Sequence, residues 1–394
     1  MERNLISIIL VKSLLFVSFI SLANCTTIRS ATSCPSPCNC SVDTYSNANL
    51  NFSIVLEIEC PAEAKNVDLH EFFLARSRVW DATKFDSVHI KRLPNSELKE
   101  NFFGSFKFRY LRIAESNISM IHPDAFRSTI NLTEFNLINC TFSERLENGS
   151  ELFNAINRFK NLRIFRISRS NLKKVMSDAF SPSLGKLAIV RLDNNEITEF
   201  GDRAVYHLYN LTWLDLAGNR LREINNETFL LPSVTDKPLQ IDLDNNALTG
   251  HSFKEGSFSN VNRPIVLLLR SNKIEFLPEK VFLPLLKSSS FRVFPSKNKF
   301  ICDCNNRWIL VEKYLSSLAH DEIICEDGTS IWSKDLQDFN YCDLTVNDVK
   351  DSLMDLVDFM SKLKLLSTAH EKHILSLVKN RTDINRRFGF SIPI

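Results

Sequence analysis

One short pattern recurs along this chain and limits the folds that the chain can adopt. In each copy, apolar and polar residues alternate, and an asparagine then takes a place where the pattern predicts burial. The clearest copies are VRLDNNEI, LDLAGNRL, IDLDNNAL and LLLRSNKI, which begin at Val190, Leu214, Ile241 and Leu267. A polar residue at a fixed place inside an apolar run indicates a repeated structural unit whose interior needs that amide.

Weaker copies extend the pattern in both directions. They are VHIKRLPN, LRIAESNI, FNLINCTF, FRISRSNL and VFPSKNKF, which begin at Val88, Leu111, Phe135, Phe165 and Val293. The asparagine position then falls at 93, 116, 140, 170, 195, 219, 246, 272 and 298, in steps of 23 to 30 residues. This period and the spacing L-x-x-L-x-L-x-x-N-x-L are the signature of leucine-rich repeats. We therefore expect an α/β fold, a solenoid with a curved parallel sheet on its concave face.

The asparagines have a structural explanation in such a solenoid. Each coil begins with a short strand, in which Leu214 and Leu216 point inward, and the chain then turns sharply. A buried amide such as that of Asn219 can hydrogen-bond the backbone groups that the turn leaves unpaired, and an unpaired amide would be costly. We expect Asn195, Asn219, Asn246 and Asn272 to form a ladder, which is weaker where Ser116 and Ser170 replace asparagine.

Two other residue types fit the same interior. Cys140 occupies the asparagine position of its coil, which predicts a buried, inert thiol rather than a reactive one. The return half of four coils ends in phenylalanine, at Phe126, Phe180, Phe229 and Phe282. We expect these rings to stack into a second interior column.

The remaining cysteines lie in two groups near the two ends of the repeats. The members are Cys34, Cys38, Cys40 and Cys60, and Cys302, Cys304, Cys325 and Cys342. Disulfides are favoured in an exported chain, whereas four thiolates can also hold zinc. The first group and the second group resemble the N-terminal and C-terminal cysteine caps of extracellular leucine-rich repeat proteins, in the second case including a core tryptophan, Trp308.

The resemblance implies a disulfide pairing and a role. First-to-third and second-to-fourth pairing gives Cys34–Cys40, Cys38–Cys60, Cys302–Cys325 and Cys304–Cys342. The layout is also similar to that of secreted arthropod proteins that look like the non-catalytic leucine-rich subunit of the Oplophorus luciferase complex. That likeness implies a binding or stabilising role.

The chain begins with a pattern typical of export. An apolar run from Leu5 to Leu22 ends at small residues, which predicts a signal peptide over 1–25. Beyond it we expect an N-terminal cap over 26–80, repeats over 81–297, a C-terminal cap over 298–342 and a helical tail over 343–394. Nine Asn-x-Ser/Thr sequons are candidate glycosylation sites: Asn39, Asn51, Asn117, Asn131, Asn139, Asn148, Asn210, Asn226 and Asn380.

Residues that alternate with the inward leucines should face outward on the concave side. Among them Arg112, Arg166 and Arg191 make the first half basic, while Asp193, Asp215, Asp242 and Asp244 make the second half acidic. Ile164, Ile189 and Trp213 form an apolar stripe beside the change of sign. Apolar residues rimmed by charge are typical of a protein-binding surface. A solvated face with balanced charges is the alternative.

The tail carries a different pattern. Apolar residues follow a heptad from Val346 to Leu377, behind a capping box at Thr345 and Asp348. This stripe can pair with another copy or a partner, or lie against the C-terminal cap.

The sequence gives little support for catalysis. It contains neither G-x-S-x-G nor a phosphate-binding loop, and the histidines of HEKH (370–373) have the wrong spacing for a zinc protease. A net charge of +2 gives no general attraction to nucleic acid. We expect an exported, non-enzymatic protein without cofactors or a membrane span that binds an unidentified protein on its concave face. The alternative is a structural or stabilising subunit of an extracellular complex.

Overall fold

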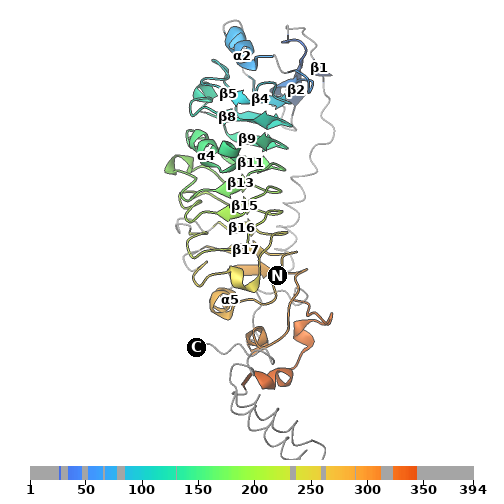
Figure 1. The fold of residues 1–394 in the computed structure, drawn as a ribbon. Coiled ribbons are helices and arrows are strands. Elements are labelled where there is room, and N and C mark those ends of the chain that lie inside the picture. Colours follow the sequence, from blue (N-terminus) through green and yellow to red (C-terminus); the bar gives the residue numbers. More distant parts are fainter. Residues whose placement is uncertain are drawn as a thin grey trace, which may run out of the picture.

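The computed structural model shows a stack of coils with one long sheet along one side (Figure 1). It describes residues 26–27, 34–46, 52–64, 67–77, 85–129, 131–230, 237–258, 263–288, 290–311 and 323–343. The expected signal peptide, the heptad tail with the HEKH motif, and the sequons Asn51 and Asn380 lie outside these residues.

The main sheet has twelve strands in chain order. They are β1 (Thr26–Thr27), β2 (Asn39–Ser46), β3 (Phe52–Glu59), β4 (Ser87–Lys91), β6 (Tyr110–Ala114), β9 (Glu134–Ile138), β11 (Ile164–Ser168), β13 (Ile189–Arg191), β15 (Trp213–Asp215), β16 (Leu239–Asp242), β17 (Ile265–Leu268) and β18 (Phe291–Phe294). The first three strands pair antiparallel, and every later pairing from β3 to β18 is parallel. The expected α/β solenoid is confirmed.

Short elements on the return side complete the coils. Three pairs of two-residue strands link neighbouring coils: β5 (Glu97–Leu98) with β8 (Met120–Ile121), β7 (Asn117–Ile118) with β10 (Thr141–Phe142), and β12 (Lys174–Val175) with β14 (Glu199–Phe200). The α-helices are α2 (Leu69–Ser77), α3 (Glu144–Glu147), α4 (Ser150–Ile156), α5 (Glu279–Leu286) and α6 (Arg307–Val311). The 3-10 helices are η1 (Arg127–Thr129), η2 (Pro182–Leu184), η3 (Gly250–Ser252), η4 (Ile331–Ser333) and η5 (Leu336–Asp343). None of the helices in the described part of the chain combines the length and apolarity needed to span a bilayer.

The predicted amide ladder runs through the interior. Asn219 Nδ2 donates to the carbonyls of Leu192 and Leu216, both at 2.9 Å, and its Oδ1 accepts from the backbone N–H of Ile197 at 3.0 Å. The same bonds recur at the other predicted ladder asparagines. Each amide therefore ties its own turn to the preceding coil.

In the first half of the stack, serine replaces asparagine at two ladder positions, and the ladder has fewer hydrogen bonds there, as expected. Ser170 Oγ donates to the carbonyl of Ser168 and accepts from the N–H of Cys140 at 3.0 Å, so it makes one bond of each kind. Ser116 Oγ does the same, with Ala114 and Leu93. The Cys140 thiol is buried and lies 3.6 Å from the carbonyl of Ile113.

The backbone turns left-handed at the residue before each ladder position. These φ angles lie between 52° and 68° at Arg92, Glu115, Asn139, Arg169, Asn194, Gly218, Asn245, Ser271 and Lys297. This region costs a non-glycine residue roughly 1 kcal/mol or more. Each such N–H from Arg92 to Ser271 donates to a carbonyl of the next coil, which offsets that cost. The turn is therefore held by backbone bonds rather than by glycine.

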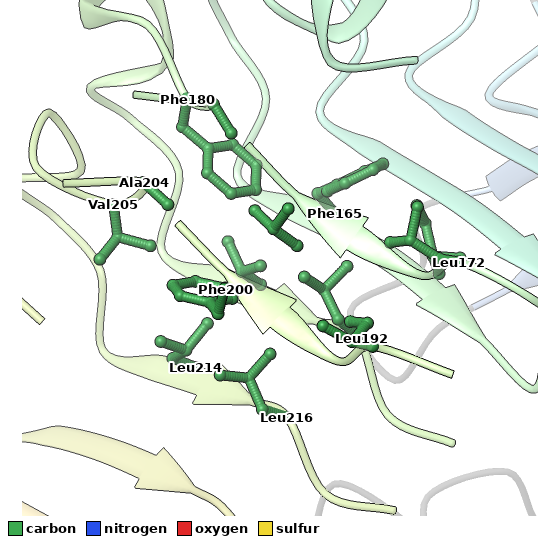
Figure 2. Packing of buried hydrophobic residues seen from close by; sticks show 14 of the residues in the cluster. Phe165, Leu172, Phe180, Leu192, Phe200, Ala204, Val205, Leu214 and Leu216 are labelled. Atoms are coloured by element: carbon green, nitrogen blue, oxygen red, sulfur yellow. The ribbon is translucent and has the colours of Figure 1, made fainter. Parts of the chain in front are cut away.

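Phenylalanine rings and leucines fill the space behind the sheet. Phe126, Phe180, Phe229 and Phe282 are all buried, as predicted. Figure 2 shows Phe165, Leu192 and Leu214 projecting from successive coils into one interior that also holds Phe180 and Phe200. Phe165 and Phe180 meet edge to face with their centroids 6.2 Å apart. The predicted second column is thus part of a continuous apolar core.

Disulfides close both ends of the stack. The bonded pairs are Cys34–Cys40, Cys38–Cys60, Cys302–Cys325 and Cys304–Cys342, the pairs that the family resemblance implies. At the C-terminal end the Trp308 side chain is buried, and its Nε1 donates to the carbonyl of Leu277 at 3.1 Å. At the N-terminal end, strands β2 and β3 extend the sheet itself.

We expect Asn219→Ala to lower the free energy of unfolding by about 3 kcal/mol, because it removes three hydrogen bonds and leaves the buried N–H of Ile197 without a partner. Ser170→Ala should lower it by about 1 kcal/mol, because it removes one donor and one acceptor. Chemical denaturation of the purified protein measures both values. Equal losses in the two variants would contradict a graded ladder.

Candidate functional site

The outer face of the main sheet, which we call the concave face, carries side chains in register from coil to coil. Its central row is Glu57, His89, Arg112, Asn136, Arg166, Arg191, Asp215, Asp242, Leu268 and Phe294. Arg112, Arg166, Arg191, Asp215 and Asp242 lie in one row in chain order, as the alternation in the sequence predicts. The structure adds Glu57 from β3 and Phe294 from β18 to this row.

The predicted apolar stripe is a real row. Ile164 pairs with Ile189, and Ile189 pairs with Trp213. All three are half-buried rather than exposed. The Arg191 guanidinium lies 4.8 Å from the centre of the Trp213 ring, within range of a cation–π interaction.

Beside this stripe, the charges at the change of sign bind one another. Arg191 Nε donates to Asp215 Oδ2 at 3.1 Å and lies 3.6 Å from Asp193 Oδ1. Arg166 Nε donates to Ser168 Oγ at 2.7 Å, and that hydroxyl donates to Asp193 Oδ1 at 2.5 Å. These five residues form what we call the central charge network. It holds both guanidinium groups in place against the apolar stripe.

Burial shifts the pKa values of charged groups around this network. The pKa of Asp215 is raised to about 6, first by burial and then by the nearby Asp193 and Asp242 carboxylates, against the opposing effect of Arg191. The pKa of Asp242 is raised to about 6, again mainly by burial. The pKa of Arg166 is lowered by burial and by the Arg191 charge.

The acidic half of the face differs from the prediction. Asp215, expected to face solvent as a contact residue, is 4% exposed and lies beneath Arg191, so that expectation is wrong. Asp193 is also buried. Asp242 and Asp244 are half-buried, and each carboxylate accepts a backbone N–H, from Asp244 at 3.0 Å and from Arg270 at 2.7 Å. These carboxylates brace turns as well as carrying charge.

The basic half of the concave face also contains acidic side chains. Strand β3 brings Glu57 and Glu59 to the face, where they lie 3.3 Å from His89 Nδ1 and 3.1 Å from Lys91 Nζ. Together with Arg112, which is exposed, they line a hollow of about 230 Å³. Sequence reasoning missed both glutamates because β3 lies before the first repeat. The alternation in VLEIE (55–59) is the signal that could have found them.

Asn39 lies in β2 of the main sheet, opposite Glu59, whereas the other described sequons begin outside the strands of that sheet. Asn39, Asn117, Asn131, Asn139, Asn210 and Asn226 are exposed. Asn139 follows β9 directly, so it lies at the edge of the concave face. Asn148 is half-buried, and its Nδ2 donates to the carbonyl of Glu144 at 2.9 Å.

The part of the chain that the structure describes holds no cluster of three or more metal-ligating side chains. Burial raises the pKa of the Cys140 thiol to about 11, so it is protonated at neutral pH and a poor nucleophile.

Comparison with known proteins agrees with the fold. The family described as "Leucine rich repeat" matches residues 160–221 and 185–235. Osteomodulin from Bos taurus is 29% identical over 213 residues, covering 54% of this chain and 45% of that protein. Oligodendrocyte-myelin glycoprotein from Homo sapiens is 25% identical over 189 residues, covering 43% and 41%. The chain thus spans less than half the length of each of these relatives.

One solved structure is similar to this chain. It is a chain in the octameric complex of Latrophilin 3 (Lec, Olf), Unc5D (Ig, Ig2, TSP1) and FLRT2 (LRR), at 22% identity and a TM-score of 0.47. The match covers 77% of this chain and 98% of that one. The family match and the repeated coil geometry together establish a leucine-rich repeat fold.

The raised pKa of Asp215 predicts a measurable pH dependence of stability. Its folded pKa of about 6 lies above the unfolded value, so the folded state takes up a proton between pH 6 and pH 4 that the unfolded state does not. Relative to Asp215→Asn, the wild-type protein should gain about 2 kcal/mol of unfolding free energy as the pH falls from about 7 to about 4. Urea denaturation across this range tests it. A difference that stays constant with pH would show that Asp215 titrates normally.

Proposed function

We propose that this protein is exported and binds another protein through its concave face, without catalysing a reaction. The four disulfides support export, because such bonds persist in oxidising compartments. The exposed sequons support the same location. The architectural likeness to the non-catalytic Oplophorus luciferase subunit agrees with a binding role and stays a prediction.

One observation carries the proposal, the packing of Arg191 on Trp213 beside Ile164 and Ile189. Tryptophan and arginine are the residues most enriched at the energetic centres of protein interfaces. A sheet face that contacts only solvent carries mainly charged side chains surrounded by water. On this face an apolar row interrupts the charged side chains.

The central charge network strengthens the argument. Asp215 and Asp193 fix the Arg191 guanidinium, so binding does not need to order a free arginine side chain. We infer that the partner covers β11, β13 and β15, the strands that carry this stripe and this network.

The stabilising-subunit alternative rests on the tail beyond residue 343, outside the described residues. It predicts that partners contact the tail rather than the sheet. The experiment for the concave face can therefore separate the two functions with one additional variant.

The test begins with the secreted protein as bait in extracellular fluid, followed by mass spectrometry of what is retained. For the partner so identified, Trp213→Ala should weaken binding by about 2 kcal/mol or more, which is about thirtyfold or more in Kd. Tyr209→Ala is the matched control, because Tyr209 is an exposed aromatic residue outside the face strands. Its Kd should equal that of the wild type.

Deletion of residues 345–394 is the second variant of the experiment. If the partner binds the concave face, this deletion leaves the Kd unchanged. Full binding by a folded Trp213→Ala protein, with loss of binding on tail deletion, would overturn the proposal in favour of the tail.

A further inference from the structure

A hollow on the return side of the coils lies directly beside a sequon. Its volume is about 550 Å³, and it is lined by Pro123, Asp124, Phe126, Arg127, Asn131, Asn157, Arg158, Lys160 and Asn161. The lining comes from two successive coils. The second of these coils runs from ladder position 140 to 170. This step of 30 residues is the longest among the ladder positions and contains α3 and α4.

Asn131 is held in a defined orientation at this hollow. Asn161 Nδ2 donates to Asn131 Oδ1 at 3.0 Å, and Lys186 Nζ donates to Asn161 Oδ1 at 2.7 Å. The Asn131 carboxamide therefore cannot rotate freely. Among the described residues, no hydrogen bond occupies its Nδ2, the atom to which an N-linked sugar attaches.

The hollow has the chemistry that a sugar needs. Pro123 supplies exposed apolar surface, Phe126 lies buried beneath the hollow, and Arg158, Lys160 and Asn157 supply polar groups around it. Most of the lining residues are polar or charged, which suits a sugar, because its hydroxyl groups both donate and accept hydrogen bonds. Arg158 also pairs with Asp124 at 3.2 Å, which keeps one wall of the hollow in place.

A second sequon gives an internal comparison. Asn210 begins the same tripeptide, Asn-Leu-Thr, and like Asn131 it lies three residues before a strand of the main sheet. Thr133 and Thr212 even make the same bond, each donating its hydroxyl to a carbonyl of the preceding coil. Asn210 differs in two respects. Its Nδ2 donates to the carbonyl of Gly185 at 2.7 Å, and it does not line the hollow.

We propose that Asn131 carries an N-linked glycan whose first N-acetylglucosamine units lie in this hollow, beside Pro123 and between Arg158 and Asn161. The glycan covers the flank of the solenoid at its longest coil and leaves the concave face open. The proposal relies only on the export part of the proposed function, and not on protein binding.

The experiment uses the full chain secreted from cultured animal cells. Occupancy at Asn131, Asn210 and Asn226 is measured by glycopeptide mass spectrometry. The native protein is then treated with a peptide-N-glycosidase, and sugar release is followed at each site. Release at Asn131 should be about tenfold slower or more than at Asn226, because the enzyme acts only on the fraction of molecules whose glycan is out of the hollow. After denaturation the rates should converge.

Two variants keep the sequon and alter the hollow. Asn161→Ala removes the bond to Asn131, and Arg158→Ala removes one wall; either should speed release at Asn131 towards the rate at Asn226. If Asn161→Ala is not secreted, Arg158→Ala decides. An unoccupied Asn131, native release as fast as at Asn226, or slow release unchanged in the variants would each overturn the proposal. Absence of the wild-type protein from the medium, with every sequon bare, would instead count against export itself.

Discussion

Each coil ends its strand with a sharp turn, and the buried side chain just after that turn decides whether the coils can stack. The turn leaves carbonyls facing an interior that water does not enter, where an unpaired carbonyl would be destabilising. Asn219 answers this by donating to its own coil and to the previous one. Because the same bond crosses from coil to coil, it fixes their spacing and their register. The rows on the concave face exist only because this interior row aligns the strands.

The two halves of the stack achieve that alignment by different means. From Asn195 to Asn298 every ladder position is an asparagine that donates to two carbonyls or more. Before it the positions hold leucine, serine or cysteine, and there the aromatic contacts are dense, as in the edge-to-face contacts of Phe73 with Phe103 and Phe106. Edge-to-face ring pairs add stability beyond the area that they bury. Directional hydrogen bonds in one half are thus matched by ring packing in the other.

The repeat made the interior predictable, and the limits of prediction lie where the repeat ends. Spacing alone placed Asn219, Cys140 and Phe229 inside, because strand alternation and coil period leave no other place for them. Strand β3 was missed as part of the face because its pairing with β4 joins residues outside the repeat. The pattern also could not show that Asp215 is covered. The burial of Asp215 depends on the conformation of the Arg191 side chain. That conformation depends in turn on the contacts of Arg191 with Asp193 and Trp213.

The central charge network shows why charge counted along a sequence is a poor guide to the charge that a partner meets. Arg166 and Arg191 are half-buried and bound to carboxylates, whereas Arg112 is exposed. The middle of the sheet is therefore a surface on which positive and negative side chains are paired, with Trp213 beside them.

The backbone bonds at the left-handed turns have a consequence for how such proteins change in length. Every turn from Arg92 to Ser271 donates to the coil that follows it, and every amide reaches to the coil before it. The bonding between neighbours is therefore the same at each junction of the asparagine half. A whole coil duplicated or lost there would find matching partners above and below, while both sealed ends stayed as they are. Duplication or deletion of the gene segment that encodes a coil can thus lengthen or shorten the solenoid while the hydrogen bonds between coils stay the same.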